Sequence, residues 1–397
     1  MGASRSAPRR GSVVVAAAVA QKPGWGGHSW AVLQYLLGFR RLGWDVTLLD
    51  WLEPSICTGA GGESVPPRDS VQLRYLEAVA TSFGLGDDVA VLLKERGGGR
   101  TWIGMGEAEV RRRLAEADFL LNVMGYLTEP DLVEAAHLRV FLDIDPGFGQ
   151  MWRDLELADV FRGHDRFATV GENIGRPGCD VPTCGLDWIA TAPPVVLDMW
   201  PPCREGRDVF TTVGAWRGQY GPVEYRGRTY GLRVHEFRRL ADLPRRTGRS
   251  FEAALDIDPS DEPDRAALES GGWSLVDPRA RAGDPQAYRG YIQGSMAELM
   301  VAKNMYVQTR GGWFSDRSVC YLASGKPVVA QDTGWTANHP SGEGLLCFAT
   351  LEEAAAAVED VASAPARHAR AARELAEEHF DSDRVLTRLA DRLGAAA

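Results

Sequence analysis

The N-terminal region of the chain has the pattern of a strand, a glycine-rich loop, a helix and a second strand. Residues 12–19 form an apolar run, residues 21–28 are rich in glycine, and residues 29–42 have helical periodicity. Gly43 ends this helix, and residues 45–50 form a second apolar run. A strand, a helix and a strand in this order give parallel strands joined by a right-handed crossover. The pattern therefore predicts an α/β fold built on a parallel sheet.

The same pattern continues and then restarts after a proline-rich segment, residues 193–202. Strands are expected at 118–123, 138–144 and 166–170 before this segment, and at 208–213, 250–257, 273–276 and 304–308 after it, with helices within 286–301. A proline-rich segment between two such series is typical of a linker between domains. We therefore predict two Rossmann-like domains, 11–200 and 201–380, that face each other across a ligand-binding cleft. Residues 1–10 are expected to be a disordered tail, and a C-terminal helix at 381–397 is a candidate to pack back on the first domain.

The composition is that of a globular protein, with 397 residues, 45% hydrophobic residues and a net charge of −10. A negative net charge disfavours non-specific binding to nucleic acid and to anionic membranes. We therefore expect no nucleic acid partner, and we expect any anionic ligand to be held by a local basic pocket. The apolar run at 13–20 follows two arginines, as in a signal peptide, but it is at the short end for one. No other run approaches a membrane span, so a cytoplasmic location is expected.

The six cysteines include no CxxC pair and no spacing typical of a zinc finger. Cys179 and Cys184 are close in sequence, but they lie among prolines and glycines with no histidine nearby. This arrangement favours free thiols in a reducing compartment over a disulfide or a metal site. We expect no bound metal and no cofactor.

Residues 309–335 read as a loop, a helix, a turn and a buried strand, and they are the strongest candidate for an anion-binding element. Ser315 or Asp316 can cap the helix, and Arg317 and Ser318 fall in its first turn. Backbone N–H groups are unpaired at a helix start, and an arginine there can donate two hydrogen bonds to a phosphate. The alternative is a surface arginine beside an ordinary helix cap. We favour a diphosphate site.

Several short motifs carry a resemblance to a known family. They are Ser324-Gly325-Lys326-Pro327-Val328-Val329, Asp332-Thr333-Gly334, Gly342-Glu343-Gly344-Leu345-Leu346 and, near the N-terminus, Gly26-Gly27-His28. In this order they resemble the GT-B glycosyltransferases, with an acceptor-binding N-terminal domain and a nucleotide-sugar-binding C-terminal domain. Ser315-Asp316-Arg317-Ser318 is similar to the spore-maturation-protein-like group and to actinobacterial natural-product glycosyltransferases.

That resemblance implies a sugar donor linked to UDP, GDP or TDP and a small-molecule acceptor, as in antibiotic biosynthesis. Donor-binding candidates are Arg217, Lys303, Arg310, Ser315, Asp316, Arg317, Ser318, Thr333, Gly334, Trp335, Thr336 and Glu343. Acceptor-binding candidates are Trp25, Gly26 and Gly27 in the first glycine-rich loop. Each basic candidate taken alone is also compatible with a structural surface charge, and Trp335 is also compatible with core packing.

Candidates for the catalytic base are His28, at the end of the glycine-rich loop, and Asp143 and Asp145, at the end of a predicted strand. Histidine suits proton transfer at neutral pH, and a carboxylate can accept a hydrogen bond from the acceptor hydroxyl. The alternatives are a histidine that caps the helix and carboxylates that belong to the turn before Pro146 and Gly147.

The chain departs from the retaining GT-B families at two positions. Those families carry two glutamates eight positions apart before the GxP turn, and counting back from Gly325 places Gly312 and Cys320 there. Neither a retaining nor an inverting outcome is therefore implied. The second glutamate usually binds the ribose, and Glu343 is a candidate substitute.

Three alternatives to a glycosyltransferase remain at this point: a sugar-nucleotide epimerase of the same fold, a phosphorylase, and a binding protein that has lost catalysis. Gly24, Gly26 and Gly27 do not make the GxGxxG pattern, so a nicotinamide cofactor is weakly supported. No phosphate-binding loop of the Walker type occurs either, which disfavours nucleoside triphosphate hydrolysis.

The choice of base predicts the behaviour of two variants. His28→Ala and Asp145→Asn are each expected to lower turnover, because each would remove a group able to accept the acceptor proton. The measurement is steady-state release of nucleoside diphosphate, made separately for each variant. Near-normal turnover in both variants would show that neither residue is the base.

Overall fold

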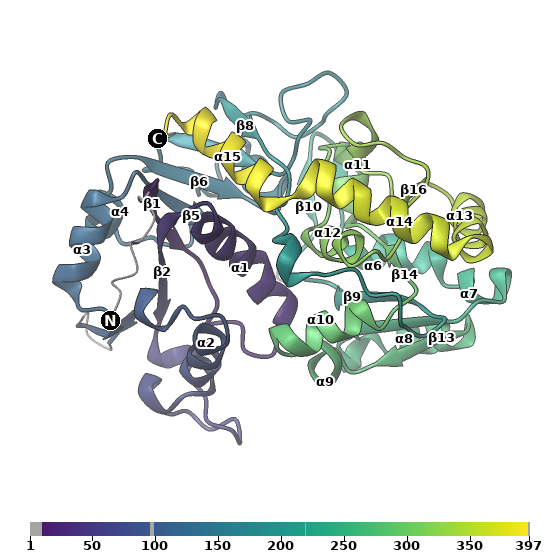
Figure 1. The fold of residues 1–397 in the computed structure, drawn as a ribbon, viewed down its shortest axis with the longest axis horizontal. Helices are drawn as coiled ribbons and strands as arrows, with labels where there is room; N and C mark the ends of the chain where they lie inside the picture. The colour runs from purple at the N-terminus through teal and green to yellow at the C-terminus, as the bar shows by residue number, and fades with distance from the viewer. Residues whose placement is uncertain (1–9, 96–98, 219, 396–397) are drawn as a thin grey trace, which may run out of the picture. The chain divides into compact units, whose positions relative to one another are not determined.

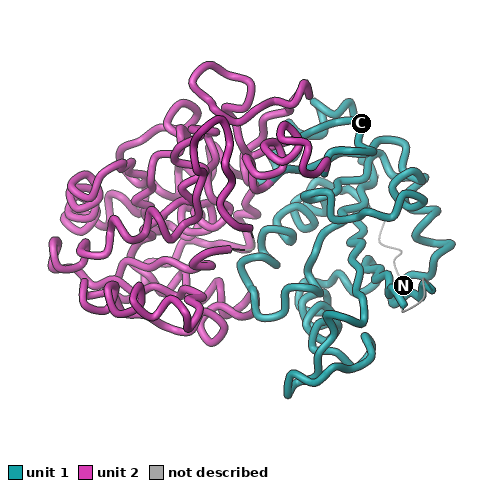
Figure 2. Tube along the Cα trace, turned by 180° about the vertical axis from the view of Figure 1, so that it is seen from behind, with its two compact units in different colours: residues 1–143, 160–168, 382–397 teal, residues 144–159, 169–381 magenta. Residues whose placement is uncertain are grey.

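The structure is a computed structural model, and it describes residues 10–95, 99–218 and 220–395. All but the last residue of the expected tail at 1–10 lies outside this part. The chain divides into two compact units, drawn in teal and magenta in Figure 2. Unit 1 comprises residues 1–143, 160–168 and 382–397, and unit 2 comprises residues 144–159 and 169–381.

The first sheet has eight strands in the order β4-β3-β2-β1-β5-β6-β7-β8. Their bounds are β1 Gly11–Ala16, β2 Trp44–Leu52, β3 Val89–Lys94, β4 Arg100–Gly104, β5 Phe119–Val123, β6 Arg139–Asp143, β7 Arg166–Thr169 and β8 Trp188–Ala190. β1 pairs in parallel with β2 and β5, and β4 pairs antiparallel with β3. Central strands such as β5 are buried along their whole length, as expected where helices cover both faces of a parallel sheet.

The helices of unit 1 are α1 Gly26–Arg41, α2 Val71–Ser82, α3 Glu107–Glu116, α4 Pro130–Val133 and α15 Ser382–Leu393 (Figure 1). The C-terminal helix α15 packs against α1. A Cβ atom at Gly38 would lie 2.5 Å from Leu386 Cδ1, so glycine permits this close approach. Arg41 and Asp383 form an ion pair of 3.0 Å between the same two helices.

The second sheet has six strands in the order β13-β12-β9-β14-β15-β16, and each adjacent pair is parallel. Their bounds are β9 Phe210–Ala215, β12 Phe251–Asp256, β13 Trp273–Val276, β14 Ala297–Met300, β15 Val328–Gln331 and β16 Leu345–Phe348. β9 lies in the middle of the sheet; β12 and β13 are added on one side of it, and β14, β15 and β16 on the other. This is the Rossmann strand order, and the order reverses between β9 and β14.

Unit 2 also contains ten α-helices among its described residues and a short hairpin of β10 Val223–Tyr225 and β11 Arg228–Tyr230. The helices are α5 Phe148–Asp154, α6 Arg233–Phe237, α7 Leu243–Thr247, α8 Glu262–Ser270, α9 Pro278–Ala282, α10 Pro285–Gln293, α11 Asn304–Thr309, α12 Asp316–Ala323, α13 Leu351–Ser363 and α14 Pro365–Leu375. The compact units follow a different course from the predicted division at residue 200, because residues 144–159 and 169–200 belong to unit 2.

Two elements next to the proposed anion site were assigned the wrong type. Residues 286–301 contain α10 and then the strand β14, and residues 304–308, expected as a strand, lie in the helix α11. β14 is only four residues long and fully buried, so it lacks the alternation that marks a half-buried strand. Strand β3 was not predicted at all; five of its six residues are buried, and it too lacks alternation.

Candidate functional site

The best candidate site in unit 2 lies where the strand order reverses, beyond the carboxyl ends of β9 and β14. Arg233, the first residue of α6, reaches this point and donates a hydrogen bond of 3.3 Å from Nη1 to the Ala215 carbonyl. A Cβ atom at Gly214 would lie 2.1 Å from the same nitrogen. The glycine at the end of β9 therefore makes room for the guanidinium.

Arg233 is a cation without a matching anion. No carboxylate of the described residues pairs with it, and its buried Nε has no hydrogen-bond partner in the described part of the chain. Burial, together with the nearby guanidinium of Arg317, lowers the pKa of Arg233 to about 10. The group remains protonated at neutral pH, so a bound anion would relieve an unfavourable charge.

Arg317 is buried and its guanidinium is bound mainly within the protein, which corrects its predicted role as a freely available phosphate ligand. Its Nε donates to Glu298 Oε1 at 2.5 Å, and its Nη1 donates to the Val213 carbonyl at 3.0 Å. Burial opposes the charge of Arg317, but the ion pair with Glu298 outweighs it and raises the Arg317 pKa. The prediction for Arg317 did not take into account Glu298, which lies on β14 and has a fully buried side chain.

The start of α12 keeps features of an anion site. Ser315 is the N-cap, and its hydroxyl accepts a hydrogen bond from the Arg317 N–H at 3.2 Å. The Asp316 side chain is exposed. Four buried polar atoms around this helix start and the sheet edge have no partner among the described residues: Arg233 Nε, Glu298 Oε2, Arg317 Nη2 and Ser318 Oγ. Buried polar atoms of this kind normally bind water or ligand atoms.

Asp145 lies beside two residues that follow β14. Lys303 Nζ donates to Asp145 Oδ2 at 2.5 Å, and the Tyr306 hydroxyl donates to Oδ1 of the same carboxylate. The Tyr306 ring stacks on Trp313 with centroids 4.2 Å apart. Asp145 was predicted in the acceptor-binding domain, but it belongs to unit 2 and contacts a donor-binding candidate. Asp143, two residues earlier, is buried at the end of β6.

His28 is held by its own unit in a neutral form. α1 begins at Gly26, so Gly26, Gly27 and His28 form the first turn of the helix instead of the predicted loop, and Trp25 is the residue before it. His28 Nε2 donates to the Ala18 carbonyl at 2.5 Å. Burial lowers the pKa of His28 to about 4. An imidazole with this pKa is a weak general base at neutral pH.

Three charged donor-binding candidates are engaged by other side chains. Arg217 follows β9 but pairs with Asp261 at 2.5 Å, and Arg310 pairs with Asp332 at 3.1 Å. Glu343 lies before the amino end of β16, 3.6 Å from Arg367, and thus at the edge of the sheet opposite Arg233. The structure therefore does not bring Glu343 to the end of β9, because the parallel strands place it at the other edge.

The predicted sugar-binding residues after β15 are mostly structural. Thr333 and Trp335 are fully buried, and the Trp335 indole donates to the Gln331 carbonyl at 3.0 Å. The Gly334 carbonyl accepts a hydrogen bond of 3.0 Å from Asn173 Nδ2. Of this segment, Thr336 alone has an exposed side chain. Trp335 therefore packs in the core, which was the alternative interpretation of its sequence position.

The two positions that carry glutamates in the retaining families have structural roles here. Gly312 has a φ of +76°, and a Cβ atom there would lie 2.8 Å from Asn173 Cγ. Asn173 occupies that space and donates to the Arg310 carbonyl at 3.1 Å. Cys320 is buried within α12, with its thiol 3.3 Å from the Asp316 carbonyl. A glutamate at either position would disrupt the local packing.

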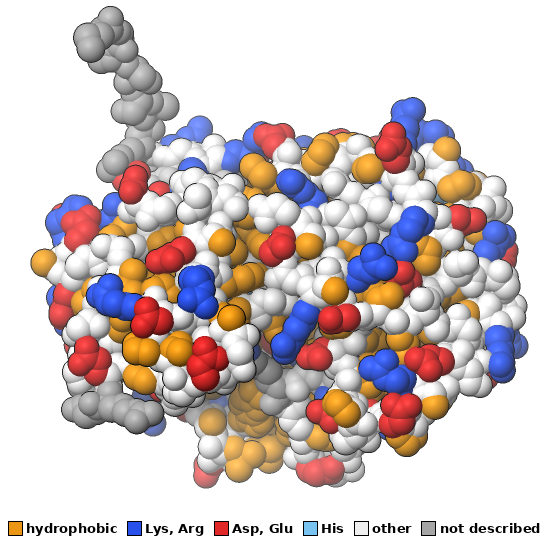
Figure 3. All heavy atoms as spheres, turned by 90° about the horizontal axis from the view of Figure 1, so that it is seen from below, with side chains coloured by type: hydrophobic (Ala, Val, Ile, Leu, Met, Phe, Trp, Pro, Cys, Tyr) orange, Lys and Arg blue, Asp and Glu red, His pale blue; other side chains and the backbone are white. Residues whose placement is uncertain are grey.

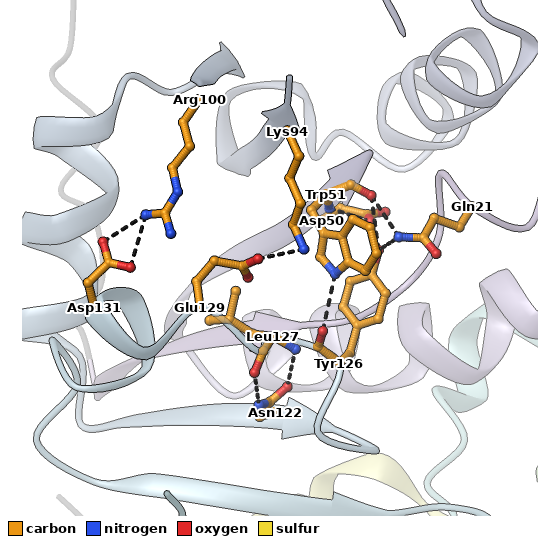
Figure 4. Close-up of polar contacts among 10 residues, drawn as sticks. All are labelled: Gln21, Asp50, Trp51, Lys94, Arg100, Asn122, Tyr126, Leu127, Glu129 and Asp131. Carbon is orange, nitrogen blue, oxygen red and sulfur yellow. Dashed lines mark hydrogen bonds and ion pairs between the residues drawn. The ribbon is translucent and has the colours of Figure 1, made fainter. Parts of the chain in front are cut away.

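Unit 1 has its own polar cluster at the carboxyl ends of its strands (Figure 4). The Asp50 carboxylate accepts hydrogen bonds from the N–H groups of Val19, Ala20 and Trp51 and from the Tyr126 hydroxyl. Burial raises the pKa of Asp50 to about 6. In dinucleotide-binding folds an acidic residue at this point binds the ribose, but Asp50 is used to fix the loop after β1.

The same cluster holds a lysine on an aromatic face. Lys94 Nζ lies 3.6 Å from the centroid of a Trp51 ring and 2.5 Å from Glu129 Oε1, as Figure 4 shows. The Trp51 ring also stacks on the Tyr126 ring, with the two centroids 5.4 Å apart. Both aromatic side chains and the lysine are thus already paired, so this cluster stabilises the edge of unit 1.

Sequence reasoning missed Arg233, Glu298, Asn173 and Asp50. Arg233 is separated from Gly214 by a hairpin of no recognisable pattern, and Glu298 lies in a segment that was assigned to a helix. Asn173 carries a signal in principle, because glycines at 311 and 312 indicate that another backbone segment approaches closely.

The described residues contain neither a candidate metal centre nor a helix able to span a membrane. No group of three or more His, Cys, Asp or Glu side chains could hold a metal ion there. In the same part of the chain, every helix is too short or too polar to cross a membrane. Catalysis without a metal or cofactor remains a prediction.

The fold is shared with solved glycosyltransferase structures. An alpha-glucosyltransferase in complex with UDP and a 13-mer DNA matches with a TM-score of 0.58 and 12% identity over 97% of this chain and 100% of that one. A glycosyltransferase involved in avilamycin A biosynthesis matches with a TM-score of 0.54 and 14% identity over 97% of both chains. Anabaena HepE in complex with UDP and glucose matches with a TM-score of 0.53 and 12% identity over 97% of this chain and 100% of that one. The chain therefore has the GT-B fold. No family model and no curated protein matches the sequence.

The expectation that nucleic acid is excluded as a partner is wrong. The fold is shared with an alpha-glucosyltransferase solved in complex with both UDP and DNA. The expectation used the net charge of −10, which is a sum over the whole chain. On the face in Figure 3, basic and acidic side chains are interspersed, so the sum does not describe any one surface.

The buried pair predicts a specific pattern of stability. Arg317→Met is expected to lower the free energy of unfolding by about 3–5 kcal/mol, because it leaves the Glu298 carboxylate buried and unpaired. Combining it with Glu298→Leu is expected to restore most of the loss. Urea unfolding followed by tryptophan fluorescence measures both. An Arg317→Met variant as stable as the wild type would contradict the buried pair.

Proposed function

We propose that this protein is a glycosyltransferase that takes a sugar from a nucleoside diphosphate donor bound at the reversal point of the unit 2 sheet. The observation that carries the proposal is Arg233, a cation over the end of β9 with no carboxylate partner among the described residues. Ligands of doubly wound sheets bind beyond the carboxyl ends of the strands at this point. The GT-B fold supports the same class of reaction.

In this proposal Arg233 and the start of α12 stabilise the leaving diphosphate. As the bond between the sugar and the β-phosphate breaks, negative charge grows on the phosphate oxygens. The Arg233 guanidinium and the backbone N–H groups at the start of α12 that do not bind the Ser315 cap can donate to those oxygens. Arg317 acts indirectly, because its pair with Glu298 attaches the first turn of α12 to β14.

Asp145 is the better candidate base. Its carboxylate lies beside Lys303 in unit 2, the unit that contains the proposed donor site, whereas the His28 imidazole is bound to the Ala18 carbonyl in unit 1. The acceptor oxygen forms a bond to the anomeric carbon, and its proton passes to the Asp145 carboxylate. The diphosphate leaves with the electron pair of the broken bond.

The finer features of the reaction are also proposals. UDP is the first donor nucleotide to test, since two of the similar proteins were solved with UDP. A hexose donor is supported by the similar protein solved with UDP and glucose, and a small-molecule acceptor by the glycosyltransferase involved in avilamycin A biosynthesis. A cytoplasmic location remains a prediction from the sequence.

A nucleotide-sugar-binding protein without transfer activity is the second candidate. Gly312 and Cys320, at the positions of two family glutamates, favour it, because both have structural roles here. Steady release of UDP from UDP-glucose in the presence of acceptor would exclude it. Binding of UDP-glucose with no release of UDP from any acceptor would support it over the enzyme.

The role of Arg233 predicts the effect of two substitutions on UDP binding. Arg233→Ala is expected to weaken binding by roughly 10- to 100-fold, the usual effect of losing a hydrogen bond between charged groups. Gly214→Ala is expected to weaken it too, because the added methyl displaces the guanidinium. Isothermal titration calorimetry with UDP measures both effects.

Arg249→Ala is the matched control. Arg249 precedes β12 at the opposite edge of the same sheet, and its exposed side chain pairs with Glu359 at 2.9 Å. Unchanged UDP affinity is expected there. An equal loss of UDP affinity in the Arg233 and Arg249 variants would show that the loss does not come from a local contact with UDP. Unchanged UDP affinity in Arg233→Ala would show that Arg233 is not part of the donor site.

A further inference from the structure

The exposed large apolar side chains of the described residues occur in one small region of unit 2. They are Leu155, Leu157 and Tyr220, which are 38%, 70% and 37% exposed. Leu155 and Leu157 follow the end of α5, and Tyr220 lies in the loop after β9. Isolated exposed leucines are ordinary, but a contiguous group of them indicates a binding surface.

The exposed side chains lie around the Trp152 ring, and we call this group the α5 patch: Trp152, Leu155, Leu157 and Tyr220, with Phe148 buried beneath them. The Tyr220 ring packs on Trp152 with centroids 4.8 Å apart and on Phe148 at 5.5 Å. The chain after α5 folds back, with Leu157 N donating to the Trp152 carbonyl at 2.8 Å. The fold-back keeps the segment that carries both leucines beside Trp152, on which the Tyr220 ring packs.

The α5 patch adjoins the candidate base. Lys303 Nζ lies 5.3 Å from the Phe148 ring centroid and 2.5 Å from Asp145 Oδ2. Asp145 precedes α5 by two residues, and Tyr220 is close enough that burial and then the Asp145 charge raise its pKa. A molecule that lies on the rings thus has a carboxylate at its edge.

We propose that the α5 patch is the acceptor subsite, and that it binds a planar, apolar acceptor whose hydroxyl is directed to Asp145. This inference rests on the proposed transfer reaction. The ring system lies on Tyr220, Trp152 and the two leucines, and the hydroxyl donates a hydrogen bond to the Asp145 carboxylate. That carboxylate then takes the proton as the oxygen forms its bond to the anomeric carbon and the diphosphate leaves with the electron pair.

The charges around the α5 patch favour an uncharged acceptor over an anionic one. Four carboxylates surround the α5 patch, Asp145, Asp154, Glu156 and Asp159, against three cations, Arg153, Arg226 and Lys303. Arg153 is 3.8 Å from Asp159 and is partly neutralised by it. An anionic ligand would meet net negative charge beside the apolar surface.

The test uses the full-length protein and 4-methylumbelliferone, a planar phenol, as the acceptor probe. Equilibrium dialysis gives its dissociation constant without donor, and release of UDP from UDP-glucose gives transfer. Leu157→Asp and Tyr220→Ala are each expected to raise the dissociation constant by about tenfold or more and to leave UDP affinity unchanged. Asp145→Asn is expected to keep probe binding and to lose transfer.

Ala266→Asp is the control, since it places the same charge on an exposed residue of α8 in the same unit. Probe binding that is equally strong in the Leu157→Asp and wild-type proteins would overturn the acceptor subsite, and so would no binding of the probe by the wild type. Transfer to a hydroxymethylated base in DNA that is unaffected by Leu157→Asp would also overturn it. Failure of the wild type to bind UDP would instead contradict the proposed function.

Discussion

The buried ion pair between Arg317 and Glu298 is the interaction on which the candidate donor site depends. It joins the first turn of α12 to the middle of the sheet, and the same arginine also binds the end of β9 through the Val213 carbonyl. Glu298 offers its carboxylate to Arg317, and Arg233 remains without an anion among the described residues. Arg317 thus fixes the position of α12, while Arg233 is available to bind an anionic ligand.

The polar groups at the carboxyl ends of the strands have different roles in the two sheets. In unit 1 the carboxylate at the end of β2, Asp50, is completely engaged by backbone N–H groups and Tyr126, and Lys94 is paired with Glu129. In unit 2 the corresponding edge holds Arg233, which has no carboxylate partner among the described residues, and buried polar atoms that lack a partner there. Polar groups that are satisfied stabilise a fold, whereas unsatisfied ones at a strand-order reversal indicate a ligand.

The sequence was sufficient for the fold and for the position of α12, because Gly325 and Pro327 mark the turn between that helix and a buried strand. It was insufficient where short buried segments show no hydrophobic periodicity. As a result β14 was predicted as part of a helix and α11 as a strand. That error hid Glu298, and without Glu298 the arginine at 317 seemed free to bind phosphate. Arg233 could not be found from spacing, since the hairpin of β10 and β11 separates it in the sequence from the end of β9, which it contacts.

A crystal structure of the protein with UDP tests the central claim most directly. The account predicts the diphosphate within hydrogen-bond distance of the Arg233 guanidinium and of the backbone N–H groups at the start of α12, with the Arg317–Glu298 pair intact. A diphosphate bound by Arg217 or Arg310 with Arg233 uninvolved, or UDP bound at the strand ends of unit 1, would contradict it.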